Sequence, residues 1–291
     1  METADRSGTP IRSVFVAIGL TIAGIFTAEL LTLPTILVDS NLMDAPTETS
    51  RALRTVFFTL NFLGFFVAGA VYLWWTERDW SFVNLKVPST RGIGIAIAGV
   101  GISLVFLFAM NAVSIVLEIP SSENSVMNFI GTDPTMVLIM IAIVFLFNAP
   151  AEEFLFRGVI QTRLYAAFSK SQAVVITSVI FAVVHLPAYA LAADGSLEPT
   201  TAIAFSLVVV FGGSIIFGYL YAVTDNLFVP TIAHAGFNAF QFGMLYLVLR
   251  FGDEEDVDAI TSSTLDSLTT ILEFVPTVLE ASRAMVLSVP V

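Results

Sequence analysis

The chain contains no cysteine, only two histidines, and only Lys86 and Lys170 as lysines among its 291 residues. The lack of cysteine excludes disulfides, thiolate metal sites and a cysteine nucleophile. Charged residues make up 12% of the chain, about half of their usual share in soluble proteins. Because 12 Lys and Arg face 24 Asp and Glu, no basic patch is available to bind a nucleic acid.

The chain is rich in long apolar segments. The chain is 56% hydrophobic with a mean hydropathy of +0.88, and a spanning helix needs about 20 apolar residues. Seven runs are predicted to span, at about 14–38, 52–75, 92–117, 134–156, 172–191, 201–223 and 227–249. The predicted fold class is therefore an all-α polytopic transmembrane bundle of seven to eight spans.

Four segments follow from this pattern. They are a polar N-terminal tail (1–13), the N-terminal transmembrane helices (14–132), a second group of spans (133–250), and an acidic linker with an amphipathic or eighth helix (251–291). The first span has no small-residue cleavage site after it and is expected to be retained.

The distribution of basic residues predicts the orientation. Eight of them fall on the side of the N-terminus, namely Arg6, Arg12, Arg78, Lys86, Arg91, Arg157, Arg163 and Lys170, against Arg51, Arg54, Arg250 and Arg283 on the other. The positive-inside rule then predicts a multi-pass cell-membrane protein with a cytoplasmic N-terminus.

Two adjacent carboxylates and an arginine end the fourth apolar run, in the stretch 148–157 (Asn-Ala-Pro-Ala-Glu-Glu-Phe-Leu-Phe-Arg). Each buried charge costs on the order of 3 kcal/mol on insertion scales. Glu153 and Arg157 are four residues apart with the acid first, which favours an ion pair. Glu152 points roughly 100° away from Glu153, so it can face the interior of the bundle. Pro150 is expected to kink the helix just before the pair.

Both histidines lie in apolar spans. His185 shares a helix face with Phe181, and His234 shares one with Asn238, since each pair is four residues apart. A glutamate beside a neutral histidine can activate a water for attack on a carbonyl, and a second histidine with an amide can hold the oxyanion that develops. The alternative is that these groups only hydrogen-bond between helices. The presence of three such motifs on three spans favours a water-activating site over simple hydrogen bonding between helices.

Other intramembrane chemistries have less support. Neither histidine belongs to a His-Glu-x-x-His zinc motif, and no paired intramembrane aspartates occur. The run 212–214 (Gly-Gly-Ser) favours close helix packing over a serine nucleophile. A proton-coupled transporter using Glu29, Glu152 and His185 is a second hypothesis, but the inverted repeats expected of one are not found.

The three motifs together resemble the CPBP family of intramembrane proteases, which includes the type II CAAX prenyl endopeptidases. The resemblance covers about residues 134–249 and implies a membrane-embedded endopeptidase open toward the cytoplasm, in which the second group of spans (133–250) is the CPBP-like catalytic transmembrane domain. Its substrate would be a prenylated CAAX-like C-terminus or another membrane-associated peptide.

The resemblance also implies roles for the residues. Glu152 and His185 would activate water, and His234 and Asn238 would stabilise the oxyanion. Glu153, Arg157 and Phe181 would support the site. A metal-independent mechanism is preferred; the alternative is zinc bound by Glu152, His185 and His234.

The predicted helix ends conflict with this site. They place Glu152 near the inner end of its span but His185 about 13 residues into its own, or roughly 20 Å. Either the fourth helix continues past Arg157, or the fifth begins nearer Val175.

Overall fold

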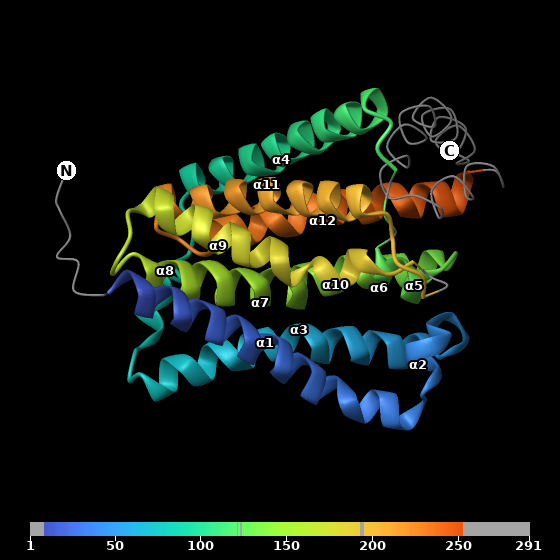
Figure 1. Ribbon diagram of the computed structural model, residues 1–291, viewed down its shortest axis with the longest axis horizontal. Coiled ribbons are helices and arrows are strands. Elements are labelled where there is room, and N and C mark those ends of the chain that lie inside the picture. Colours follow the sequence, from blue (N-terminus) through green and yellow to red (C-terminus); the bar gives the residue numbers. More distant parts are fainter. Residues whose placement is uncertain (1–8, 121, 123, 193–194, 253–291) are drawn as a thin grey trace, which may run out of the picture.

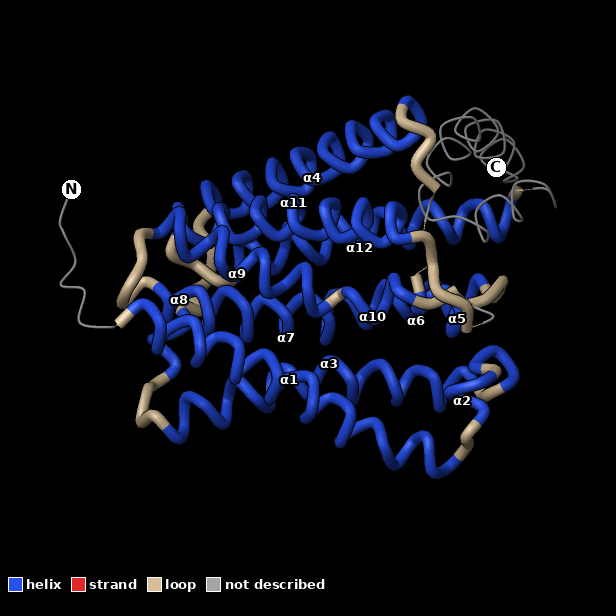
Figure 2. Tube along the Cα trace, viewed as in Figure 1, coloured by secondary structure: helices blue, strands red, loops and turns tan. Residues whose placement is uncertain are grey.

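The computed structural model describes residues 9–252 except 121, 123, 193 and 194, and these form a helical bundle without a strand (Figure 1). Helix continues through almost all of this part of the chain, and most loops lie at the two ends of the bundle (Figure 2). Most of the predicted polar tail (1–13) and of the predicted acidic linker and eighth helix (251–291) lies outside the described residues.

Six helices are long and apolar enough to cross a membrane, which makes this a multi-pass membrane protein. They are α1 (Pro10–Val38), α3 (Arg51–Trp75), α4 (Thr90–Val116), the helix Pro134–Leu164, α11 (Thr200–Thr224) and α12 (Phe228–Phe251). The predicted fifth span is instead α9 (Lys170–Val184), which has only 15 residues, followed after His185 by the short α10 (Leu186–Ala190). The all-helical architecture is confirmed, whereas the count of seven to eight spans is not.

Four short elements complete the fold outside the spans. They are α2 (Asn41–Asp44), η1 (Pro46–Glu48), η2 (Trp80–Val83) and α5 (Ser125–Ile130).

Polar side chains fix where several spans begin. Ser50 and Ser89 accept hydrogen bonds from the first-turn backbone of α3 and α4, and Asp133 does so for the helix that starts at Pro134. A capping box joins Ser169 and Gln172 at the start of α9. These caps satisfy N–H groups that the first turn of a helix leaves free.

The helix Pro134–Leu164 is the centre of the bundle. It packs against α3, α12, α9 and α1. In its apolar 18-residue stretch 44% is buried, compared with 22–39% in the equivalent stretches of the other five spans. The prediction that it ends near Phe156 is wrong. Because its residues after Arg157 are also covered by neighbouring helices, the helix continues to Leu164.

Two π-helical segments lie within this central helix. In order it consists of α6 (Pro134–Ile143), η3 (Val144–Asn148), α7 (Ala149–Glu153), η4 (Phe154–Gln161) and α8 (Thr162–Leu164). Both π segments flank the short α7, which contains Pro150, and π-helical turns are often found at functional sites. All eight residues of η4 are buried.

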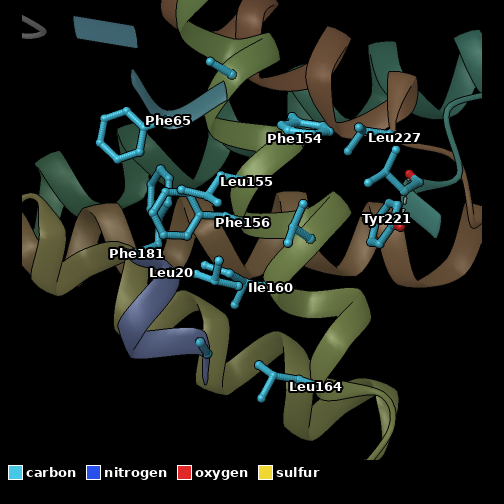
Figure 3. Packing of buried hydrophobic residues seen from close by; sticks show 14 of the residues in the cluster. Leu20, Phe65, Phe154, Leu155, Phe156, Ile160, Leu164, Phe181, Tyr221 and Leu227 are labelled. Carbon is cyan, nitrogen blue, oxygen red and sulfur yellow. Dashed lines mark hydrogen bonds between the residues drawn. The ribbon is translucent and has the colours of Figure 1, made fainter. Parts of the chain in front are cut away.

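The largest apolar core surrounds η4. Phe156 packs against Phe65 of α3 and Phe181 of α9 (Figure 3). Phe154 lies on another side of the helix, against Phe66 and Trp80. This packing fixes both the rotation and the depth of the helix that carries the two glutamates.

The outer helices present apolar side chains to their surroundings, as expected in lipid. On α1 the exposed residues include Ile22, Phe26 and Leu33. Glu29 lies on the same outward face, exposed, and its carboxylate makes no hydrogen bond or ion pair with the described residues.

Basic residues gather at one end of the bundle, which we call the basic end. It comprises the start of α1, the loops 76–89 and 165–169, and the turn 225–227, joined by contacts of Arg163 with Ser13 and of Lys86 and Lys170 with Asp225. Arg157, counted above among the basic residues on this side, is instead buried inside the central helix.

The opposite end carries an ion-pair cluster. Asp133 pairs with Arg51 and lies 3.6 Å from Arg54. Burial raises the pKa of Asp133, but hydrogen bonds from Arg51 and from the backbone of α6 outweigh it, so the net pKa is lowered. The carboxylate therefore stays ionised where it caps the central helix.

Gly64 is predicted to be essential to the α1–α3 packing. A Cβ at Gly64 would overlap the backbone of Ala28, so Gly64→Ala should force the two helices apart and destabilise the protein by about 1–3 kcal/mol. Thermal unfolding in detergent would measure the loss. Gly19→Ala is the matched control on α1, because nothing lies within 4 Å of its added Cβ. Equal melting temperatures for the two variants would contradict the prediction.

Candidate active site

The candidate site is built by the central helix and α12. Glu152 and Glu153 come from α7, Arg157 from η4, and His234 and Asn238 from α12. The two glutamates, Arg157 and His234 are at most 8% exposed. The two helices meet because Ala149 and Ala235 pack in a small apolar cluster of their own beside these residues.

The continued central helix removes the conflict in depth. Glu152 lies 12 residues before Leu164, or about 18 Å from the basic end at 1.5 Å per residue. His185 ends α9, which starts at Lys170, so it lies about 22 Å from the same end. The two residues therefore lie at similar depths.

Glu153 is the hub of the charged groups. Its Oε1 lies 3.2 Å from Nη1 of Arg157, the ion pair expected from the sequence, and 2.9 Å from Nδ1 of His234. With the Glu153 oxygen as the acceptor in both contacts, His234 Nδ1 is the donor of the hydrogen bond between them. In the neutral imidazole the proton is then on Nδ1, which leaves the lone pair of Nε2 free.

Arg157 is completely buried and held on three sides. Its Nη2 donates to the carbonyl oxygen and the hydroxyl of Ser214 on α11, at 3.2 and 2.9 Å. Its guanidinium lies 4.7 Å from the ring of Phe181, a cation–π distance. Phe217, also on α11, stacks on the His234 ring at 4.7 Å. The arginine thus fixes Glu153, and Glu153 fixes His234.

Glu152 is held separately from Glu153, as its different direction on the helix requires. Its Oε1 accepts a hydrogen bond of 2.8 Å from Nδ2 of Asn148, one helical turn earlier. Its Oε2 faces His234 Nε2 at 3.9 Å, too far for a direct hydrogen bond.

Asn238 is linked to the same carboxylate through Asn148. Its Nδ2 donates to Asn148 Oδ1 at 3.1 Å, and Asn148 in turn donates to Glu152. The second N–H of Asn238 makes no hydrogen bond with the described residues and remains available as a donor.

His185 lies at the break between α9 and α10. Its Nδ1 is 2.8 Å from the carbonyl oxygen of Phe181, so Nδ1 carries the proton and Nε2 is free. Its ring lies 4.6 Å from that of Phe181, which is 6.4 Å from His234. Among the described residues His185 makes no hydrogen bond or ion pair with Glu152, so Phe181 is the link between His185 and the rest of the site.

The donors do not fit a zinc ion as arranged. A zinc site needs three or four ligands around one point, and no three His, Asp or Glu side chains in the described part of the chain have such an arrangement. The His234 nitrogen nearest to Glu153 is already used in a hydrogen bond with it.

Three contributing residues were not predicted from the sequence. Asn148 precedes Glu152 by four residues, so the spacing used for the other pairs could have identified it. Ser214 was interpreted only as a small packing residue, and Phe217 carried no signal. Gly212 of the same run does pack closely, against Phe106.

The buried ion pair of Glu153 and Arg157 predicts that their contributions to the free energy of unfolding are strongly coupled. Arg157→Met should destabilise the protein by about 3–5 kcal/mol, because Glu153 is left as an uncompensated buried charge. Adding Glu153→Gln removes that charge and should recover part of the loss. A double-mutant cycle by thermal unfolding in detergent measures this, with Arg250→Met at the exposed end of α12 as control. Simple addition of the two single effects would rule out the coupling.

Comparison with protein families matches residues 134–240 to the model described as type II CAAX prenyl endopeptidase Rce1-like. Comparisons with curated proteins and with solved structures gave no match. The matched segment runs from the start of the central helix to α12 and contains every residue of the candidate site. This segment is thus similar to the type II CAAX prenyl endopeptidases, in agreement with the resemblance to the CPBP family noted from the sequence motifs.

Proposed function

We propose that the protein is an intramembrane endopeptidase that hydrolyses a peptide bond with a water held between Glu152 and His234. The observation that carries this proposal is the pair of facing atoms, Glu152 Oε2 and His234 Nε2, at 3.9 Å. Both are hydrogen-bond acceptors when the histidine is neutral, so neither can bond to the other. One water can donate a hydrogen to each at a normal length of about 2.8 Å.

Such a water is prepared for attack on a carbonyl carbon. As its oxygen forms the new C–O bond, Glu152 takes one of its protons, acting as a general base. The C–N bond then breaks, and the proton passes from Glu152 to the leaving amine. The products are a carboxylic acid, which keeps the second hydrogen of the water, and an amine, and the enzyme returns to its starting state.

The negative oxygen of the intermediate needs donors. The free N–H of Asn238 is one, and His185, when protonated at Nε2, is a second. Preorganised donors of this kind stabilise a transition state by about 3–4 kcal/mol each. The roles implied by the family resemblance are different, with His185 beside the water and His234 beside the oxyanion, and the two assignments differ in which histidine is coupled to Glu152.

The proposed substrate is a membrane-associated peptide, such as a prenylated CAAX-like C-terminus. The family match supports this class, as does a site buried about 18 Å from the basic end, which a peptide anchored in the bilayer can reach. We propose that no metal is required, since Glu152 and His234 suffice to activate water and the described donors form no metal site.

We further propose that the basic end faces the cytoplasm. It carries Arg12, Arg78, Lys86, Arg91, Arg163 and Lys170, against Arg51, Arg54 and Arg250 at the other end. This asymmetry supports a cytoplasmic N-terminus and a site nearer the cytoplasmic face.

Cleavage of a lipid-anchored peptide by the purified protein in liposomes tests the function. Glu152→Gln should lower kcat by about 10²–10⁴, the usual contribution of a general base. Glu29→Gln is the matched control, because this carboxylate is exposed on the outer face of α1. This variant should retain full activity, whereas it would lose activity if Glu29 relayed protons. Full activity of Glu152→Gln would contradict the whole proposal.

A strong chelator should have no effect on cleavage. Loss of activity that is restored by stoichiometric zinc would contradict the metal-independent mechanism.

A second set of variants identifies the histidine that shares the water. If His234 shares the water, Glu152→Gln and His234→Gln should each lower kcat nearly as much as the double substitution does. The reason is that the effects of residues that act as a unit are not additive. The cycle of Glu152→Gln with His185→Gln should then be close to additive. The reverse pattern would support the assignment in which His185 is the partner.

The orientation can be read with single cysteines, since the chain has none of its own. Asp225→Cys at the basic end should react with a membrane-impermeant thiol reagent only after the cytoplasmic side is opened. Glu118→Cys, beyond the opposite end of α4, should react in intact cells. Labelling in the opposite order would reverse the proposed topology.

A further inference from the structure

Most of the unpaired buried polar atoms lie in one column. Eight buried side-chain atoms of the described residues have no hydrogen-bond partner, and six of these belong to Glu153, Arg157, Gln161, Thr177 and Ser178. One of the six, Arg157 Nη1, still faces Glu153 Oε1 in the ion pair. All five residues are at most 1% exposed. The first three succeed one another at intervals of four along the central helix, and the other two lie on α9, which packs against it.

Close contacts set the level of each residue. Near Gly218 of α11, Val174 of α9 and Oε1 of Gln161 lie side by side, at 3.1 and 3.0 Å from where a Cβ of that glycine would be. Further in, Phe181 lies over Arg157. Thr177 and Ser178 come between Val174 and Phe181 in α9, so their hydroxyls lie between the levels of Gln161 and Arg157.

The hydroxyls are unusual within this protein. Thr21, Thr32, Thr59 and Thr231 each donate to a carbonyl of their own helix four residues earlier. Thr177 and Ser178 make no such bond. Buried polar groups without a protein partner are usually hydrogen-bonded to internal water, and four successive levels of donors and acceptors provide the two to four partners that each water needs.

The column has one end at the site and one near the surface. Glu153 Oε2 is its inner end, beside His234. At the outer end, Nε2 of Gln161 donates to the hydroxyl of Tyr165, which belongs to the loop of the basic end. Glu153 and Gln161 are eight residues apart, about 12 Å along the helix.

We propose that this column holds a file of internal waters that supplies the site from the basic end. The file runs from Tyr165 past Gln161 and the hydroxyls of Thr177 and Ser178 to Arg157 and Glu153. Peptide hydrolysis consumes one water per turnover, and a substrate lying over Glu152 would cover other approaches to it. The supply role rests on the proposed function; the presence of the waters does not.

Radiolytic labelling with mass spectrometry tests for the waters, because bound water close to a buried side chain generates the oxidising radical there. In the wild-type protein in nanodiscs, Phe181 should be labelled although it is only 4% exposed. Met140 is the internal control, because it is 2% exposed in an apolar cluster and its thioether is readily oxidised. Labelling of Phe181 no greater than that of Met140 would overturn the proposal.

The paired substitution Thr177→Val with Ser178→Ala tests the position and the role of the waters. It should abolish the labelling of Phe181 and lower kcat about tenfold at unchanged KM, as expected for a lost water-mediated hydrogen bond. Ser103→Ala is the matched control, since its hydroxyl is also buried and unpaired but lies on α4; both readouts should stay at the wild-type level.

The remaining outcomes are decisive as well. Unchanged labelling in the paired variant would place the water elsewhere and overturn the column. Lost labelling with unchanged kcat would overturn the supply route. Should the wild-type protein cleave no peptide, the proposed function fails, and the labelling still decides whether the column holds water.

Discussion

The ion pair of Glu153 and Arg157 is the interaction on which the rest of the structure depends. Two charges completely removed from solvent require compensation from every side, and this requirement accounts for the surrounding residues. Ser214 and Phe181 hold the arginine, and His234 shares the glutamate. Three helices are thereby fixed to one point of the central helix. Glu152, one residue away, lies among these fixed helices but makes none of the contacts that fix them.

The two glutamates consequently have different roles: Glu153 makes the structural contacts, and Glu152 is available for proton transfer. Glu153 makes charged contacts that leave it little freedom, whereas Glu152 is held by a neutral amide on one oxygen and leaves the other facing His234. A residue that is to take up and release a proton benefits from neutral neighbours, because a directly paired arginine would hold it ionised. Asn148 supplies such a neighbour and also couples Glu152 to Asn238.

Sequence reasoning predicted local contacts better than it predicted the ends of the helices. The i,i+4 spacing of Glu153 and Arg157 predicted their ion pair because that contact is local. The end of the central helix was placed too early, since the hydropathy of a segment does not reveal that polar residues such as Gln161 are covered by α9 and α11. The contact between His234 and Glu153 joins residues 81 positions apart in the chain. No spacing rule predicts it, nor the choice of His234 over His185 as the histidine facing Glu152.

The π-helical winding of η4 limits which changes of length the chain can accept. Each residue of an α-helix turns the chain by about 100°, so one residue inserted or deleted between Phe154 and Gln161 would rotate everything that follows. Arg157 and Gln161 would then no longer face α11 together, where they now reach Ser214 and Gly218. Related chains are therefore expected to differ in length in the loops at the ends of the bundle, and to keep this eight-residue segment free of insertions and deletions.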